Sequence, residues 1–337
     1  MKKWTKFLAA MGMATVAWGL YRNMKYPIQQ EYRLLNRIIV PGQALNDKIA
    51  SLSNACIDRM DKPPLPEGVL RKLLVIKEGG RRINLSLYMP EKAAGKLPCL
   101  VYCHGGGFVF ETAFPFHRLA AEYARRGHCL VVMPDYRTSA RHPFPAGFED
   151  CYATLKWLWE RGAFLNIDTN RMAVGGDSAG GALAAACALR ARDENGPKLC
   201  FQMLIYPVLD VRMKTASMWH YSDSPLWNAN LNRRMWEMYL KNGFQGMTAY
   251  ASPALAEDLS GLPPAYIEAE EYDCLHDEAV AYANALQKAG VAVTLKDVAG
   301  SFHGFDSFWN KRLTRKMLDV RGRVLKAAFE KAQGTNL

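Results

Sequence analysis

The sequence lacks the cysteine arrangements that bind metal or build a disulfide framework. Among its 337 residues there is no C-x-x-C pair and no His/Cys cluster with zinc spacing. Its eight cysteines are scattered, and Cys99, Cys103 and Cys129 lie in apolar runs, where cysteine behaves as a small buried hydrophobe. A chain of this length can bury a large core without disulfides. We therefore expect eight structural cysteines and no bound metal.

A long hydrophobic run is also lacking. The uncharged segment Phe7–Tyr21 has 15 residues, fewer than the roughly 20 that span a bilayer and more than a usual signal core. Neither a small-x-small cleavage site nor a lipobox cysteine follows it. We predict that residues 1–25 form an uncleaved anchor or a helix lying on a membrane, so that the protein is membrane-associated. The alternatives are a cleaved signal of an exported or periplasmic protein, and a helix packed on the body of a cytoplasmic one.

Acidic residues are scarce at both ends of the chain. Lys and Arg total 43 against 32 Asp and Glu, for a net charge of +11. Residues 1–37 hold seven basic residues and one acid, and residues 311–331 hold eight and two, so each end carries +6. Two solvated basic faces, or attraction of both ends to an anionic membrane surface, account for this distribution. No nucleic-acid-binding motif accompanies the charge, so nucleic acid is not an expected partner.

What the sequence does contain is a regular alternation of apolar runs and helical stretches. Two runs at 73–76 and 83–88, joined at Gly79–Gly80, predict a hairpin. Further strands are expected at 98–103, 129–133, 171–175, 199–205, 264–269 and 291–298, and helices at 116–126, 148–160, 179–192, 276–289 and 307–331. This alternation is typical of the α/β class, with a mostly parallel central sheet and helices on both faces.

Two segments fall outside that alternation. Residues 26–66 have helical patterning and end in a proline-rich stretch, so we expect N-terminal cap helices there. Residues 211–250 are rich in Trp and Tyr without a strand pattern, and are expected to form a helical cap inserted into the main domain at 67–337.

The segment Gly176-Asp-Ser-Ala-Gly180 is the most informative motif. It follows an apolar strand-like run and opens an alanine-rich helix. A G-x-S-x-G between strand and helix is typical of a nucleophile elbow, in which glycines allow a turn sharp enough to expose the Ser178 hydroxyl. At the head of a helix, the backbone N–H groups and the helix dipole favour negative charge. Ser178 is the candidate nucleophile.

Three consecutive glycines, Gly105, Gly106 and Gly107, follow the predicted strand at 98–103 and His104. Such a run lets backbone N–H groups approach a ligand without obstruction by side chains. Together with the N–H of Ala179, just after Ser178, they are expected to form an oxyanion hole. A flexible or phosphate-binding loop is the alternative.

A nucleophilic serine needs a base, and the base needs an acid that orients it. His303 is the best placed of seven histidines, because it lies in a loop just past the last predicted strand. Asp273 follows the preceding strand, and nearby acids, Asp277 and Glu278, fall where a helix begins. The order Ser178, Asp273, His303 is the order of the α/β-hydrolases.

These motifs together resemble the hormone-sensitive-lipase family of α/β-hydrolases, which includes bacterial carboxylesterases and arylacetamide deacetylases. The matching segments are His104–Gly107, Asp135–Arg137 with His142–Ala146, Gly176–Gly181, Leu262–Pro264, Tyr272–Glu278 and His303–Phe305. The resemblance implies ester hydrolysis through an acyl-enzyme, with Ser178, Asp273 and His303 as the triad and a cap over the acyl pocket. Two departures stand out: Thr138–Arg141 replaces the family's Leu-Ala-Pro-Glu, and Cys274 replaces a proline.

Three functions remain open on these residues. The first is a carboxylesterase that acts on apolar short- to medium-chain esters as small-molecule substrates, with no cofactor. Its pocket would be lined by Phe108, Phe110, Trp219 and Trp227, although core packing is the simpler role for each. The second is an amide deacetylase that uses the same triad. The third is a non-catalytic small-molecule receptor, which retention of the whole triad disfavours.

Overall fold

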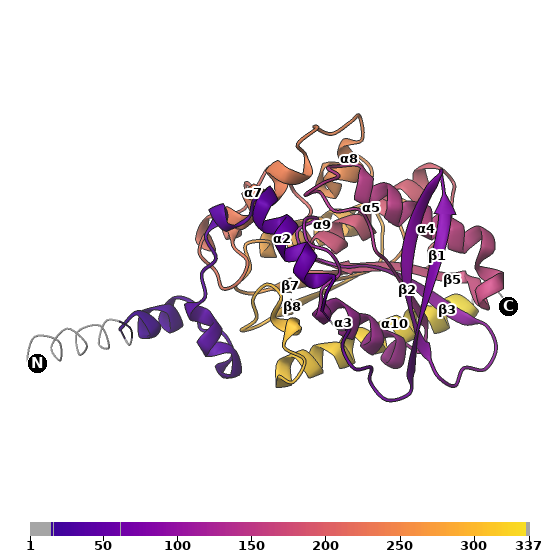
Figure 1. Cartoon of the computed structure of the whole chain (residues 1–337), viewed down its shortest axis with the longest axis horizontal. Helices are drawn as coiled ribbons and strands as arrows, with labels where there is room; N and C mark the ends of the chain where they lie inside the picture. The colour runs from indigo at the N-terminus through magenta and orange to yellow at the C-terminus, as the bar shows by residue number, and fades with distance from the viewer. Residues whose placement is uncertain (1–14, 16, 61, 335–337) are drawn as a thin grey trace, which may run out of the picture.

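An eight-stranded sheet forms the centre of the molecule. The computed structural model describes residues 15, 17–60 and 62–334 (Figure 1). The strands are β1 (Val69–Glu78), β2 (Arg81–Pro90), β3 (Leu97–Cys103), β4 (Leu130–Pro134), β5 (Ile167–Asp177), β6 (Phe201–Ile205), β7 (Ala265–Glu270) and β8 (Val293–Val298). They lie in the order β1-β2-β4-β3-β5-β6-β7-β8, in which β2 runs antiparallel to β1 and β4, and the other neighbouring pairs are parallel. The predicted mostly parallel α/β sheet is confirmed.

Helices cover both faces of this sheet (Figure 1). Side chains alternate along β3, so that Leu100 and Tyr102 pack into one core, whereas Cys99 and Val101 pack into the other. The first core is completed by α3 (Phe114–Gly127) and α10 (Arg312–Gly334), and the second by α4 (Ala146–Arg161), α5 (Ala179–Asp193) and α9 (His276–Lys288). Burial on both faces explains why the central strands are continuous apolar runs.

The largest departure from the predicted elements is at the start of the last helix. α10 begins at Arg312, not at residue 307, because Phe305–Ser307 forms a separate 3₁₀ turn. Gly304 precedes that turn with a φ of 72°, a left-handed conformation that favours glycine. The chain therefore folds back on itself directly after His303, which brings Asp306 inside the protein, where its side chain is 2% exposed.

Two segments that are distant in the sequence pack together on one side of the sheet. Residues 211–250, all of which are described, contain α6 (Ala216–His220), α7 (Ala229–Tyr239) and most of α8 (Thr248–Ala251), and no strand. Before β1 lies α2 (Asp47–Ile57), next to α7 in Figure 1. A 3₁₀ turn before α2 packs closely on α7, since a Cβ built on Gly42 would lie 3.0 Å from the Asn230 carbonyl oxygen. Their division into cap and body stays a prediction.

The described part of the N-terminal segment is held by a buried arginine. Residues 17–25 are helical, and the fully buried guanidinium of Arg22 donates to Asp223 Oδ2 at 2.7 Å and to the Asn36 carbonyl at 2.8 Å. Most of Phe7–Tyr21 lies outside the described residues. Within the ranges 17–60 and 62–334, no helix is both long enough and apolar enough to cross a membrane.

Candidate active site

Ser178 stands at the junction of β5 and α5, in a strained backbone conformation. Its φ of 57° and ψ of −123° lie where a side chain costs about 1–3 kcal/mol. The flanking glycines make the turn possible, because a Cβ on Gly180 would overlap the Cys103 carbonyl oxygen and one on Gly176 would overlap Gly180. The motif predicted as a nucleophile elbow therefore has the backbone that such a turn needs.

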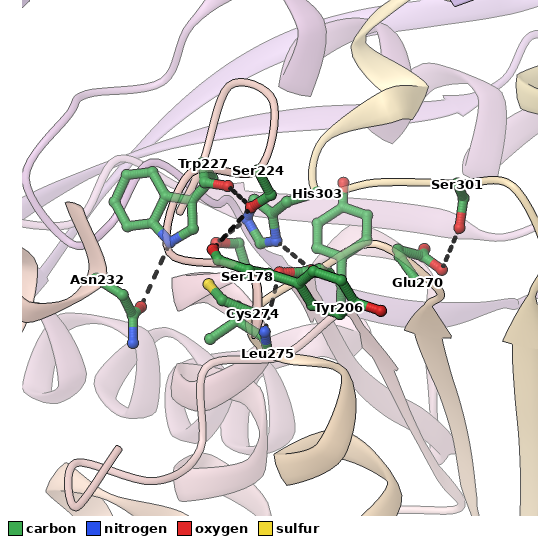
Figure 2. Close-up of polar contacts among 12 residues, drawn as sticks. Ser178, Tyr206, Ser224, Trp227, Asn232, Glu270, Cys274, Leu275, Ser301 and His303 are labelled. Atoms are coloured by element: carbon green, nitrogen blue, oxygen red, sulfur yellow. Dashed lines mark hydrogen bonds and ion pairs between the residues drawn. The ribbon is translucent and has the colours of Figure 1, made fainter. Parts of the chain in front are cut away.

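The structure brings the three predicted triad side chains into one hydrogen-bonded chain (Figure 2). His303 Nε2 lies 2.8 Å from Ser178 Oγ, and His303 Nδ1 lies 2.6 Å from Asp273 Oδ2. Asp273 is fully buried, and its other oxygen accepts the Leu275 N–H at 3.0 Å. A carboxylate can only accept, so Nδ1 carries the proton and Nε2 is free to accept the serine hydroxyl proton.

The parallel sheet explains why these three side chains lie next to one another. Ser178 follows β5, Asp273 follows β7 and His303 follows β8, and the carboxyl ends of parallel strands lie along one edge of a sheet. Residues that are 125 positions apart in the chain are thus neighbours.

The glycine loop after β3 is braced from several sides. Gly106 and Gly107 have φ values of 105° and 63°. The Phe108 carbonyl accepts the Ser139 N–H at 2.7 Å and the Ser139 hydroxyl at 3.0 Å. On α2, Asn54 Nδ2 donates to the Val109 carbonyl at 3.0 Å. These contacts fix the conformation of a loop whose glycines, by themselves, would allow many conformations.

His104 also supports this loop. It stacks on the Tyr136 ring with centroids 4.2 Å apart, and its Nδ1 lies 2.7 Å from the Gly105 carbonyl oxygen. Burial lowers the pKa of His104 to about 4, so the ring is neutral at physiological pH. With its proton on Nδ1, the neutral ring donates a hydrogen bond to the Gly105 carbonyl. His104 therefore supports the loop and is not an acid or a base in the reaction.

Comparison with known proteins shows to which family the chain belongs. The family described as alpha/beta hydrolase fold matches residues 100–307, which is more than half of the chain. The chain belongs to the α/β-hydrolase family. Carboxylesterase NlhH of Mycobacterium tuberculosis is 35% identical over 266 residues, which cover 76% of this chain and 82% of that protein. Esterase LipI of the same organism is 33% identical over 268 residues, covering 78% and 82%. A bacterial heroin esterase superposes with a TM-score of 0.82 at 32% identity, over 90% of this chain and 99% of that one.

These relationships confirm the resemblance to the hormone-sensitive-lipase branch and make the α/β-hydrolase a carboxylic ester hydrolase. Among the described residues, no three His, Cys, Asp or Glu side chains are grouped closely enough to bind a metal ion.

Of the four predicted pocket residues, Trp227 lies beside His303 (Figure 2). Its ring centroid is 5.9 Å from that of His303, and a Cβ on Gly107 would lie 2.9 Å from its Cη2 atom. Phe110 is half-buried against Gly106. Phe108 is 2% exposed and stacks on Tyr239 at 3.7 Å, as in ordinary core packing. Trp219 is 75% exposed, which places it on the outer surface of the hydrolase.

Asp177, next to Ser178, is a buried acid that the sequence did not single out. It is 2% exposed and accepts a hydrogen bond from the Tyr102 hydroxyl. Burial first, and the nearby charge of Asp306 second, raise the pKa of Asp177 to about 7. The folded protein therefore holds a proton on this carboxyl in mildly acidic solution.

Proposed function

We propose that the hydrolase cleaves apolar esters with short to medium acyl chains through an acyl-enzyme formed on Ser178. The observation that carries this proposal is the buried chain Asp273–His303–Ser178, with separations of 2.6 and 2.8 Å. A base hydrogen-bonded to the nucleophile, and itself oriented by a carboxylate, is what activates a serine hydroxyl.

In the proposed reaction, His303 takes the Ser178 proton as the serine oxygen attacks the ester carbonyl. Asp273 keeps the imidazole in the correct tautomer and stabilises the imidazolium that forms. His303 then returns the proton to the leaving alcohol. Water repeats the attack on the acyl-enzyme with His303 again as base, which releases the acid and restores the serine.

The negative oxygen of each tetrahedral intermediate would be received by the backbone N–H groups of Gly106, Gly107 and Ala179. Gly105 shapes the loop, since a Cβ at this position would lie 2.5 Å from Asp177 Oδ2. Donors that are already held in place stabilise the transition state without reorganisation, and losing one commonly costs about 10²–10³ in rate. The braces from Ser139 and Asn54 support this proposal, because they fix the loop before substrate arrives.

The expected substrate range follows from the surroundings of the proposed oxyanion site. The Trp227 ring packs against Gly107, so a bulky apolar side chain borders the site closely. With p-nitrophenyl acetate, butyrate, octanoate and palmitate, we expect kcat/KM to be highest for one of the first three and lowest for palmitate. A preference for palmitate would contradict the proposal. A p-nitroanilide hydrolysed as fast as its matched ester would favour the amide deacetylase.

We also propose that the N-terminal segment contacts an anionic membrane surface. The helix at 17–25 exposes Trp18, Leu20, Tyr21 and Met24, with exposed fractions of 44 to 82%, beside a basic stretch. The wild type is expected to sediment with phosphatidylglycerol vesicles, and a variant with Trp18, Leu20, Tyr21 and Met24 all replaced by Ser is not, while both hydrolyse soluble esters equally. This variant keeps the buried Arg22. Equal sedimentation of the two proteins would exclude this role.

A further inference from the structure

A fully buried arginine lies on the face of the sheet that is covered by α3 and α10. Arg321 of α10 is 0% exposed. Its Nη1 donates to Asp306 Oδ2 at 2.5 Å and to the Tyr123 hydroxyl at 3.2 Å, and its Nε lies 3.0 Å from Glu268 Oε2. The guanidinium thus joins α10 to β7 and to the turn just after His303.

Asp306 connects this arginine to the site. One carboxylate oxygen binds Arg321, and the other accepts the Tyr206 hydroxyl at 2.6 Å. The Tyr206 ring packs beside the His303 imidazole, with centroids 4.7 Å apart (Figure 2). A continuous path of buried side chains therefore runs from α10 through Asp306 and Tyr206 to the face of the proposed base.

The backbone conformation of Tyr206 indicates that this path does more than fill the core. Tyr206 has a φ of 35°, a positive value that is uncommon for a bulky residue and persists only where the surroundings enforce it. The bond to Asp306 holds the Tyr206 hydroxyl in that position. Trp227 lies against the same imidazole at 5.9 Å, so the ring is confined between two aromatic side chains.

Buried acidic side chains outnumber buried basic ones around Asp306. Arg321 is paired with two carboxylates, Asp306 and Glu268, and two tyrosine hydroxyls, those of Tyr206 and Tyr123, also face this group. Further acids lie close by: Asp177 on β5 and Glu270 at the end of β7, the second with a pKa that burial raises well above its usual range. A buried ion pair of this kind is weak evidence for stability, because desolvation offsets its attraction. A positioning role accounts better for its link, through Asp306 and Tyr206, to the His303 imidazole.

We propose that Asp306, held by Arg321, is a positioning residue that fixes the orientation of His303 toward Ser178 through Tyr206. This proposal rests on the proposed role of His303 as the base. It makes docking of the C-terminal helix α10 a condition of full activity.

The test compares two tyrosines whose hydroxyls serve the same buried cluster. Tyr206→Phe removes the bond to Asp306 and leaves the ring beside His303. Tyr266→Phe is the matched control, since its hydroxyl donates to Glu268 at 2.8 Å from a fully buried ring on β7. We expect both variants to lower Tm similarly, but only Tyr206→Phe to lower kcat, by about 10- to 100-fold with KM nearly unchanged, as misplacement of a reacting group does.

Asp306→Asn adds a readout that a merely structural residue would not move. It removes a buried negative charge near the imidazolium, so the acidic limb of the kcat/KM profile is expected to shift to lower pH. If kcat and this limb in Tyr206→Phe and Asp306→Asn match the wild type while Ser178→Ala is inactive, the positioning role is wrong and the proposed function stands. If Ser178→Ala is active, the proposed function itself fails.

Discussion

Ser178→Ala is expected to lower kcat for p-nitrophenyl butyrate by about 10⁵- to 10⁶-fold, because the variant lacks the atom that forms the acyl-enzyme. Some catalysis over water should remain, since the backbone donors and the binding site are still present. The side chain is 5% exposed and its hydroxyl bonds to His303, so removing it should change the free energy of unfolding only slightly. Steady-state rates and thermal unfolding measure the two effects.

The control for this variant is another buried serine. Ser252 is 0% exposed and donates to the Leu209 carbonyl at 2.8 Å, away from the proposed triad. Ser252→Ala should lower Tm and leave kcat within a few-fold of wild type. A fluorophosphonate should add to Ser252→Ala and to the wild type, and not to Ser178→Ala. Hydrolysis at an undiminished rate by Ser178→Ala would mean that Ser178 is not the nucleophile, and would contradict the proposed function.

Asp273→Asn is expected to cost about 10⁴-fold in kcat with the fold intact. The amide NH₂ can donate a hydrogen bond to Nδ1, which stabilises the wrong tautomer of His303 and leaves Nε2 unable to accept from Ser178. The carboxylate is fully buried, 2.6 Å from Nδ1, so water cannot take its place as the hydrogen-bond acceptor of His303. The loss should appear in kcat and kcat/KM alike, because the imidazolium forms only during the reaction.

Asp277→Asn is the matched control for the acid. Asp277 lies four residues further on, in the first turn of α9, where its carboxylate accepts the Ser217 N–H at 2.8 Å. Its neutralisation should reduce Tm modestly and leave kcat almost unchanged. If Asp277→Asn lost the activity and Asp273→Asn kept it, the acid would have been assigned to the wrong residue.

The alternation of apolar runs and helices was sufficient to predict the sheet, because strands that are buried on both faces are continuous apolar runs in the sequence. The placement of Ser178, Asp273 and His303 at one edge was also predictable. Each of the three follows a strand, and parallel strands end together. Here the chain order carries spatial information, although the catalytic roles of these residues stay a proposal.

The contacts that brace the site were not predictable. Asn54 reaches Val109 across 55 residues, and Arg22, one of the seven basic residues within 1–37, is buried against a partner 201 positions away. Nothing local distinguishes such a side chain from a solvated one. For the same reason, two tryptophans of one segment, Trp219 and Trp227, could not be separated. The first turns outward and the second lies against His303.

The proton held by Asp177 links folding to the acidity of the surroundings. Its folded pKa of about 7 exceeds the ordinary value, near 4 in an unfolded chain, so between these values unfolding releases a proton. This carboxyl therefore makes the fold less stable as pH rises through that interval, by up to about 4 kcal/mol once the loss is complete above pH 7. The residue that adjoins the proposed nucleophile thus makes the fold more sensitive to mild alkali.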